Sequence, residues 1–238
     1  MHLVSVIIPV FNAAKTLEAT LKSVIRQTAT TEIVVIDGGS TDGSLDIINA
    51  HIAHIAAFVS ENDRGVYDAM NKGFSKAKGD FVYFVGADDQ LHDSTVFSRL
   101  LADVEQADLI AGVVQQMPPR HPRIKEWNYP EWNWKLNLRH TLHHQGVLYR
   151  RSALPQVPFD IRFKILADYA LHLGLYRNGA IIKITDIHIA DCGSEGISKK
   201  FNIHLYKEEW HLKKEVSPFL WRLFHLMWLP LKFLYKKF

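Results

Sequence analysis

Residues 4–12 read Val-Ser-Val-Ile-Ile-Pro-Val-Phe-Asn, and residues 32–43 read Glu-Ile-Val-Val-Ile-Asp-Gly-Gly-Ser-Thr-Asp-Gly. Both stretches contain a run of β-branched and apolar residues typical of a buried strand, at 4–10 and 33–36, and polar residues follow each run. Between them, apolar residues spaced for one face of a helix run from Leu17 to Ile25. A buried strand, a helix and a second buried strand predict the start of a parallel sheet.

The same alternation of strand and helix continues toward residue 114. The further strands are expected at 57–60, 81–85 and 108–114, and the further helices at 45–52, 66–76 and 96–104. Asp42 or Ser44 is the expected N-cap of the helix at 45–52. This order predicts an α/β fold with a mostly parallel central sheet and helices on both faces.

Polar residues follow three of these strands at the point where each one ends. They are Asn12, then Asp37 with Asp42, then Asp88 with Asp89. In open α/β sheets the ligand binds outside the carboxyl ends of the strands. The three groups are therefore expected to converge on one crevice.

Two of these groups allow both a functional and a structural interpretation. Asp88 and Asp89 repel each other unless a cation lies nearby, and Mg²⁺ or Mn²⁺ prefers such oxygen ligands; alternatively, one of them caps the next helix. Asp37 and the glycines at 38–43 suit close approach to a base or ribose, or form a turn with an Asp cap. The segment lacks the lysine of a P-loop and the spacing of a dinucleotide-binding fingerprint.

Taken together, five motifs in this order and spacing resemble the family 2 glycosyltransferases. The motifs occupy residues 4–12, 32–43, 62–65 with 68–73, 77–80 and 86–89. The resemblance implies a GT-A fold, a nucleotide-diphosphate sugar donor, a Mn²⁺ or Mg²⁺ cofactor, and inversion at the anomeric carbon.

Transferred position by position, the resemblance assigns roles to individual residues. Those implied to bind the donor are Pro9, Asn12, Asp37, Arg64, Asp68, Asn71 and Asp88. Asp88 and Asp89 fall at the family's metal-binding acidic motif. The base that Asp37 would hold is usually uracil, which points to a UDP-sugar. However, the family often has Asp where this chain has Gly86, so guanine stays open as the base.

The second half of the chain resembles a narrower branch that acts on bacterial surface polysaccharides. The shared segments are 143–151, 159–160, 165–171 and 193–198. In this branch the position of Asp168 holds the catalytic base, although an Asp at a helix N-terminus also interacts favourably with the helix dipole. His144, Gln145 and Ser198 are candidate contacts to the acceptor or the phosphates.

Composition limits the class of protein. The chain has 238 residues, 28 Lys and Arg against 25 Asp and Glu, and Cys192 as its one cysteine. A disulfide framework and a multi-cysteine metal site are therefore excluded. Residues 211–238 carry a net +5 and the remainder −2, which argues against nucleic-acid binding, since a phosphate-tracking body would be basic. No signal peptide is recognised near residue 1, so a cytoplasmic body is expected.

The C-terminal segment is the expected membrane contact. Residues 218–234 are apolar and aromatic, with Arg222 and Lys232 among them, a pattern typical of a helix lying in a membrane interface. The alternative is a helix packed on the sheet or on a partner subunit. We expect peripheral attachment to the inner face of the plasma membrane through 216–238.

These observations predict the organisation of the chain and its function. A GT-A domain is expected at 1–210, with a nucleotide-sugar-binding half at 1–114 and an acceptor-side half at 115–210, followed by a basic aromatic tail at 211–238. The stretch 115–142 is predicted to be a long loop with buried aromatic residues that helps to select the sugar. The predicted reaction is sugar transfer to a lipid-linked glycan. A sugar-phosphate nucleotidyltransferase and a catalytically silent membrane scaffold are the alternatives.

Overall fold

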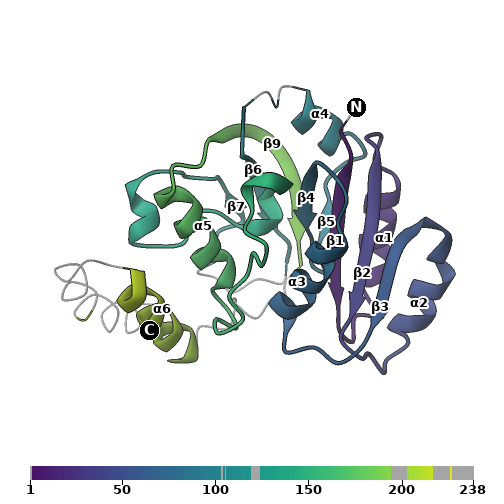
Figure 1. Cartoon of the computed structure of the whole chain (residues 1–238). Coiled ribbons are helices and arrows are strands. Elements are labelled where there is room, and N and C mark those ends of the chain that lie inside the picture. Colours follow the sequence, from purple (N-terminus) through teal and green to yellow (C-terminus); the bar gives the residue numbers. More distant parts are fainter. Residues whose placement is uncertain are drawn as a thin grey trace.

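A computed structural model describes residues 2–102, 104, 106–118, 124–193, 203–216 and 226. In it, a curved sheet of nine strands runs through the molecule and helices cover both of its faces (Figure 1). The strand order is β3-β2-β1-β4-β8-β6-β9-β5, and β7 pairs with β6. The α/β fold predicted from the sequence is confirmed.

The N-terminal half of the sheet is parallel. Its strands are β1 (Val4–Val10), β2 (Thr31–Asp37), β3 (Ile55–Ser60) and β4 (Phe81–Phe84). β1 lies between β2 and β4 and is parallel to both, and β2 is parallel to β3. Every residue of β1 and β4 is buried, which explains why their sequences are almost entirely apolar, with Ser5 as the exception.

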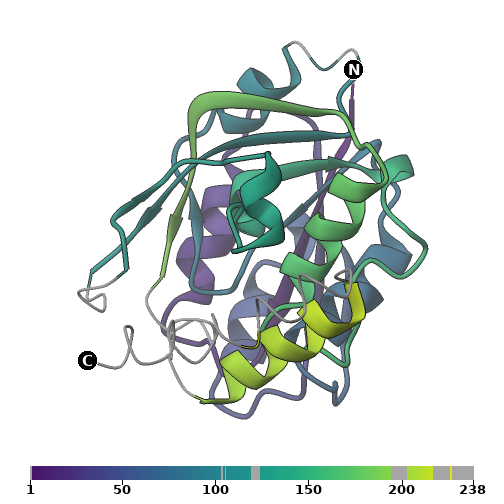
Figure 2. The same ribbon diagram turned by 90° about the vertical axis from the view of Figure 1, so that its left-hand side faces the viewer.

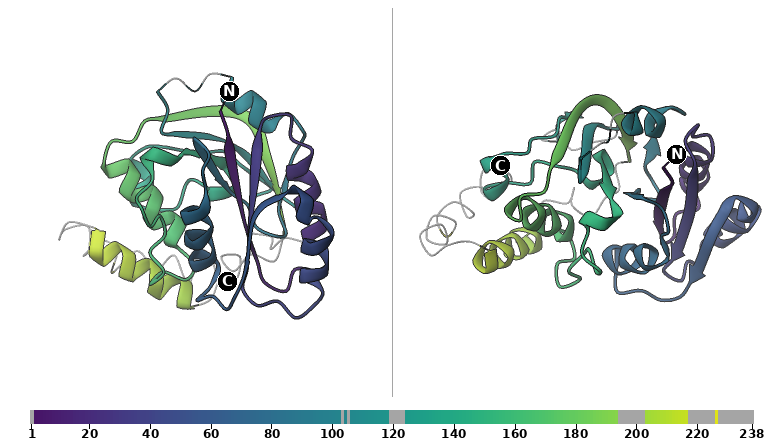
Figure 3. Two further views of the ribbon diagram at one scale, coloured as in Figure 1. Left: turned by 45° about the vertical axis from the view of Figure 1, so that its right-hand side comes forward. Right: turned by 45° about the horizontal axis from the view of Figure 1, so that its top comes forward.

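Helices on the two faces of the sheet enclose two separate cores (Figure 3). On one face lie α1 (Leu17–Ile25), α2 (Ser44–Ala50) and α4 (Val96–Leu101); on the other lie α3 (Val66–Lys76) and α5 (Ala167–Arg177). The single-turn helices are η1 (Ile52–His54), η2 (Trp134–Asn137), η3 (His144–Gly146) and η4 (Arg151–Ala153). Each helix sends one apolar face to the sheet, as the spacing predicts.

The second half of the sheet mixes strand directions. Its strands are β5 (Gln90–Leu91), β6 (Leu109–Gln116), β7 (Trp127–Asn128), β8 (Val147–Arg150) and β9 (Ile182–Cys192). β6 and β9 are parallel, whereas β8 is antiparallel to both β4 and β6, and β5 is antiparallel to β9. Parallel pairing therefore dominates in the half that the strand-helix alternation covers, and antiparallel pairing enters after it.

Two local predictions need correction. Gly43, with a φ of 94°, precedes α2, and neither Asp42 nor Ser44 is its N-cap; the Asp42 carboxylate instead accepts the backbone N–H of Ser44. In the 115–142 stretch, Trp127 and Trp134 are exposed, although burial was predicted for its aromatic residues. Because the stretch lies at the edge of the sheet through β7 and η2, only part of it faces a core.

The helix α6 (Ile203–Val216) packs beside α5 and crosses the boundary predicted at residue 210 (Figure 2). Leu212 and Lys213 are buried, so at least these residues of the predicted tail belong to the body. Val216 and Leu226 are the described residues of the membrane-contact prediction, and its other residues lie outside the described part. No helix within the described residues has the length and apolar character needed to span a membrane.

Candidate active site

The carboxyl ends of β1 and β2 form the first part of the site. Val10 pairs with Asp37 in the parallel register, so the two following loops start side by side. Asn12 adopts a left-handed conformation with a φ of 49°. Its amide oxygen accepts the Thr41 N–H at 2.9 Å, and its own N–H donates to the Ser40 hydroxyl at 2.8 Å. Asn12 therefore fastens the loop after β1 to the loop after β2.

Asp37 is fully buried at the end of β2. Its carboxylate accepts the N–H groups of Gly39 and Ser40, at 3.1 and 3.2 Å, and the Ser60 hydroxyl at 2.7 Å. Pro9 is buried one residue before the end of β1. The structure thus brings Pro9, Asn12 and Asp37 to one edge of the sheet, where Asp37 orders the glycine-rich loop.

The acidic motif lies just after β4, and its two carboxylates have different surroundings. Asp88 is half-buried, whereas Asp89 is 2% exposed. Asp89 accepts the N–H of Gly193 at 2.9 Å, the N–H of Gly86 at 3.2 Å, and the side-chain amide of Gln145 at 3.2 Å. Burial, together with the nearby charge of Asp88, raises the pKa of Asp89. Asp88 is the more open of the two carboxylates.

Gly86 is required by the position of these carboxylates. A Cβ atom at this residue would lie 2.7 Å from Asp89 Oδ2 and 3.1 Å from Asp88 Oδ1. The Asp that the family often has here could therefore not be accommodated without moving Asp89. The negative charges of two adjacent carboxylates repel each other, and their oxygens form a donor set that fits a hard divalent cation.

Asp168 lies in the first turn of α5 and is 6% exposed. Its Oδ1 accepts the Tyr67 hydroxyl at 3.1 Å and the Tyr169 N–H at 2.8 Å. Its Oδ2 lies 3.0 Å from Nδ1 of His144 and 3.9 Å from Nε2 of His140. The carboxylate is therefore held from three sides, by α3, by its own helix and by the segment before β8.

His140, His144 and His172 surround this carboxylate, and we call them the histidine cluster. His172 contacts His140 at 3.3 Å and the Tyr149 hydroxyl at 2.6 Å. Burial lowers the pKa of His140 and of His172, which favours their neutral forms. Burial acts to raise the pKa of Asp168, but the attraction of His140 and the hydrogen bond from His144 outweigh it, so that this pKa lies well below the usual range.

The helix η3 joins the acidic motif to Asp168. Its consecutive residues His144 and Gln145 contact Asp168 and Asp89 respectively, and the Gln145 carbonyl accepts the Tyr83 hydroxyl at 2.6 Å. The structure thus links His144, Gln145, Asp89 and Asp168, which sequence analysis had singled out as separate candidates.

Three residues of this site were not predicted from the sequence, namely Tyr67, His140 and His172. His172 lies four residues after Asp168, and so on the same face of α5, a spacing that offers a signal in the sequence. Tyr67 and His140 come from other elements, and nothing local marks them.

Arg64, Asp68 and Asn71 lie at the start of α3 and line a different hollow. Asp68 accepts the N–H of Arg64 at 3.0 Å and pairs with its guanidinium at 3.0 Å. The Asn71 side chain bonds both the N–H and the carbonyl of Phe159. Together with residues of α5 and α6, they border a cavity of about 1030 Å³. Ser198, a further candidate, lies outside the described residues.

This fold, with acidic residues after β4 and a buried carboxylate on α5, defines a transferase of GT-A type. The chain matches the family model described as glycosyl transferase family 2 over residues 5–160, and it belongs to this family. The resemblance noted in the sequence is thereby confirmed.

Relatives and solved structures agree with this membership. A PGL/p-HBAD biosynthesis glycosyltransferase of Mycobacterium bovis is 34% identical over 191 residues, which cover 75% of this chain and 71% of the relative. TarS 1-349 of S. aureus in complex with UDP-GlcNAc has a TM-score of 0.70 at 20% identity, over 88% of this chain and 65% of that one.

The mannosyltransferase PcManGT of Pyrobaculum calidifontis, in complex with GDP-Man and Mn²⁺, has a TM-score of 0.61 at 20% identity, over 88% of this chain and 61% of that one. At this level of identity the solved structures support the fold. The chain spans less than two thirds of the length of either solved chain.

Proposed function

We propose that this glycosyltransferase moves a sugar from a nucleotide-diphosphate donor, a UDP-sugar, to a lipid-linked saccharide with inversion, in cell-surface polysaccharide biosynthesis. The name of the mycobacterial relative, which refers to PGL/p-HBAD biosynthesis, supports an acceptor of this kind. The UDP-GlcNAc bound to TarS supports the donor class. The GDP-Man bound to PcManGT is the reason to test a guanine nucleotide as well.

The observation that carries the proposal is the link through η3 between two carboxylate sites. Gln145 reaches the acidic motif, where the donor diphosphate would bind, and His144 reaches Asp168, where the acceptor would bind. Transfer requires the anomeric carbon and the acceptor hydroxyl to be held at a fixed position relative to each other. Because His144 and Gln145 are adjacent on one turn of backbone, they fix the position of one carboxylate site relative to the other.

Asp168 is the proposed catalytic base. An ionised carboxylate offers about four acceptor positions, and three are taken by Tyr67, Tyr169 and His144. One position is left for the acceptor hydroxyl, whose proton Asp168 takes as the hydroxyl attacks the anomeric carbon. The lowered pKa keeps the carboxylate ionised between turnovers. Attack from the face opposite the leaving diphosphate gives inversion.

The proposed ligands of Mn²⁺ or Mg²⁺ are the carboxylates of Asp88 and Asp89. When bound, such a cation stabilises the negative charge of the departing nucleoside diphosphate. The half-buried Asp88 offers the more accessible oxygens. Asp89, with donors from Gly86, Gly193 and Gln145, fixes the loop on which both carboxylates lie.

On the donor side, the proposed contacts divide into two groups. Pro9, Asn12 and Asp37 lie at the strand ends that hold the nucleoside, and Asp37 acts there by ordering the loop around the base. Arg64 has an exposed side chain beside Asp68, and it is the proposed contact to the donor from α3. Asn71 fixes the backbone at Phe159, so its proposed part in donor binding is indirect.

The cavity beside α3, α5 and α6 supports an acceptor with an apolar part. Apolar side chains (Leu, Ala, Val, Ile, Pro and Phe) form most of its wall, and charged residues such as Arg64, Arg177 and Glu215 lie among them. Contact with a membrane surface through 216–238, at the cytoplasmic face, completes the proposal. It would bring the catalytic body to an acceptor anchored in lipid.

Titration calorimetry tests the donor and the cation together. Full-length chain is titrated with UDP-GlcNAc, other UDP-sugars and GDP-mannose, with and without Mn²⁺, and the Asp88→Asn variant serves as the metal-site control. Binding that requires Mn²⁺ and weakens at least tenfold in the variant is expected. Absence of binding to every nucleotide sugar would favour the silent scaffold, and release of pyrophosphate from a sugar phosphate and a nucleoside triphosphate would favour the nucleotidyltransferase.

Deletion of residues 217–238 tests the membrane contact separately. The cut follows the end of α6 and leaves its buried Leu212 in place. We expect the shortened chain to move from the membrane fraction to the soluble fraction and to retain donor binding. Unchanged partitioning would refute the membrane contact without affecting the catalytic assignment.

A further inference from the structure

We propose that His92, His188 and Asp191 form a binding site for a transition-metal dication of the zinc class, separate from the acidic motif. The site does not depend on the proposed reaction. It lies where the short strand β5 meets the end of β9, and it uses none of the residues assigned above to the donor, the cofactor or the base.

Strand pairing brings the three side chains together. β5 is antiparallel to β9, with Gln90 opposite Asp191, and the N–H of His92, the first residue after β5, donates to the Ile189 carbonyl at 3.0 Å. His188 lies three residues before Asp191 on β9. Two of the ligands thus come from one strand and the third from its neighbour.

The distances fit a shared ion. His188 Nε2 lies 2.8 Å from Asp191 Oδ1, and His92 Nδ1 lies 3.2 Å from Asp191 Oδ2. One ligand atom from each residue lies within 4.8 Å of the others. Ligand bonds of about 2.0–2.2 Å in a tetrahedral zinc site place neighbouring ligand atoms roughly 3.4 Å apart. The two carboxylate–imidazole separations, 2.8 and 3.2 Å, are slightly shorter than this value, so small side-chain rotations would admit the ion.

Two of these atoms lack an ordinary hydrogen-bond partner. Within the described residues, Nε2 of His188 and Oδ1 of Asp191 are buried and form no hydrogen bond, although they approach each other. A buried polar atom without a partner is destabilising. A cation bound to both would satisfy the imidazole nitrogen and the carboxylate oxygen at once.

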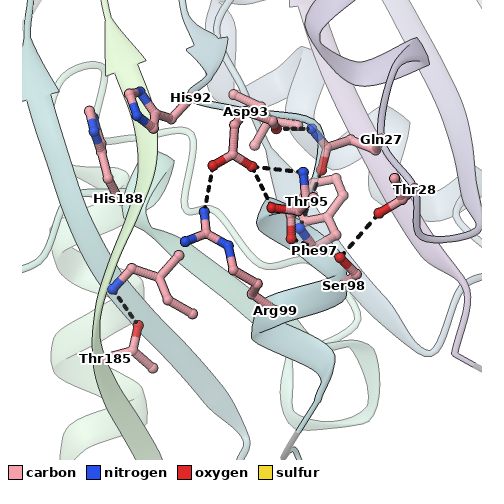
Figure 4. Close-up of polar contacts among 12 residues, drawn as sticks. Gln27, Thr28, His92, Asp93, Thr95, Phe97, Ser98, Arg99, Thr185 and His188 are labelled. Atoms are coloured by element: carbon pink, nitrogen blue, oxygen red, sulfur yellow. Dashed lines mark hydrogen bonds and ion pairs between the residues drawn. The ribbon is translucent and has the colours of Figure 1, made fainter.

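The surroundings hold the imidazoles in place and leave one side open. The rings of His92 and His188 are stacked with centroids 3.7 Å apart (Figure 4). Trp127 meets His188 edge-on at 5.0 Å. The His92 side chain is 43% exposed, so an ion and a water ligand can reach the site from solvent. The neighbouring Asp93 is bonded to Thr95 and Arg99 and does not contribute.

The donor set selects the kind of ion. Two imidazoles and one carboxylate suit Zn²⁺ and similar first-row dications, whereas Mg²⁺ and Mn²⁺ prefer oxygen ligands. We therefore expect this site to bind a zinc-like ion and the acidic motif to bind Mg²⁺ or Mn²⁺. Because Gly193, two residues after Asp191, donates to Asp89, an ion here would also fasten the strand that supports the acidic motif.

Equilibrium dialysis of the full chain against Zn²⁺ tests the proposal. His188→Phe keeps a ring beside His92 and Trp127 but removes the ligand nitrogen, and Asp191→Asn keeps the shape but removes the charge. We expect each variant to bind one zinc ion fewer per chain, or to bind that ion at least tenfold more weakly. His54→Ala, which removes an exposed histidine from η1, should bind zinc as the wild type does.

Melting temperature provides a readout that does not depend on activity. Zn²⁺ should raise it for the wild type and for Asp88→Asn, but not for His188→Phe, and a tenfold excess of Mg²⁺ should not abolish the effect. Circular dichroism of the variants without metal checks that they fold. Equal zinc uptake by the wild type, His188→Phe and Asp191→Asn would overturn the site.

Discussion

Replacing Asp168 with Asn tests the proposed base with little change of shape. In the wild type, Oδ1 accepts both the Tyr67 hydroxyl and the Tyr169 N–H, and the amide oxygen of Asn can accept the same two donors. The amide nitrogen then faces Nδ1 of His144, which accepts its N–H in the tautomer protonated at Nε2. The substitution therefore removes the charge and the basic oxygen but preserves the hydrogen-bond pattern.

We expect the substitution to lower the turnover rate strongly and the free energy of unfolding only moderately. Hydrogen bonds to a charged acceptor contribute about 1.5–3 kcal/mol and those between neutral groups about 1 kcal/mol, so the free energy of unfolding should fall by about 1–3 kcal/mol. A positioned general base contributes roughly 10²–10⁴-fold to the rate. We expect kcat to fall by that factor. Donor affinity should change less than threefold, because the role proposed for Asp168 is to contact the acceptor and not the donor.

The assay measures release of the nucleoside diphosphate in the presence of acceptor, with donor affinity determined by calorimetry on the same samples. Asp46→Asn is the matched control, because it removes an exposed carboxylate from α2, which lies at the other end of the sheet from α5 (Figure 1). An Asp168→Asn enzyme that folds and turns over within tenfold of the wild type would refute Asp168 as the base.

Three further predictions concern stability. The histidine cluster includes the buried His172 and the half-buried His140, whose pKa values are both lowered. The unfolded chain protonates both below about pH 6.5, so the free energy of unfolding should fall as the pH drops below that value, by up to about 1.4 kcal/mol per pH unit for each. Urea titrations at several pH values measure this change. Gly86→Ala should lower the free energy of unfolding by about 1–3 kcal/mol, because the new Cβ would lie 2.7 Å from a carboxylate oxygen of Asp89. In α5, Gly174→Ala meets open space and should raise the free energy of unfolding by up to about 1 kcal/mol. Lys213→Ala should cost about 3 kcal/mol, since this buried side chain donates to the Asn137 carbonyl and the Tyr169 hydroxyl, and the exposed Lys214→Ala should change stability by less than about 0.5 kcal/mol.

Each of these stability predictions has a contrary outcome. Stability that stays constant or rises between pH 7 and pH 5 would contradict neutral buried imidazoles. If alanine at Gly86 and at Gly174 changed stability equally, the carboxylate of Asp89 would be able to move aside without a loss of stability. Equal effects at Lys213 and Lys214 would mean that α6 is not held by its buried lysine.

The first half of the fold could be predicted because its signals are local. Val4–Val10 and Thr31–Asp37 each contain a run of apolar and β-branched residues, and the helix Val66–Lys76 was predicted with its observed bounds. The antiparallel pairing of β8 with β4 and β6 was not predicted, since β8 has the same apolar sequence that a parallel strand would have. Its partners are distant in the chain, and no turn signal marks the change of direction.

The candidate site was partly accessible from the sequence for a similar reason. Asp88, Asp89 and Asp168 stand out because acidic residues directly follow a strand or open a helix. The contact of Tyr67 with Asp168 joins residues 101 positions apart, and it depends on how α3 and α5 pack on one face of the sheet. The role of Gly86 was also hidden: as a departure from the family it left the identity of the base open, whereas in the structure its missing Cβ makes room for Asp89.

The buried Lys213 of α6 has a consequence for the order in which the molecule is completed. Its ammonium group binds the Tyr169 hydroxyl, and Tyr169 is the neighbour of the proposed base. During synthesis the N-terminal part of a chain emerges and folds first. The sheet and the acidic motif, whose Asp89 accepts the N–H of Gly193, can therefore be complete once residue 193 has been made, while the surroundings of Asp168 remain incomplete until residue 213 has been made and α6 has docked. A nascent chain would thus acquire the capacity to bind a donor before it acquires the capacity to use one.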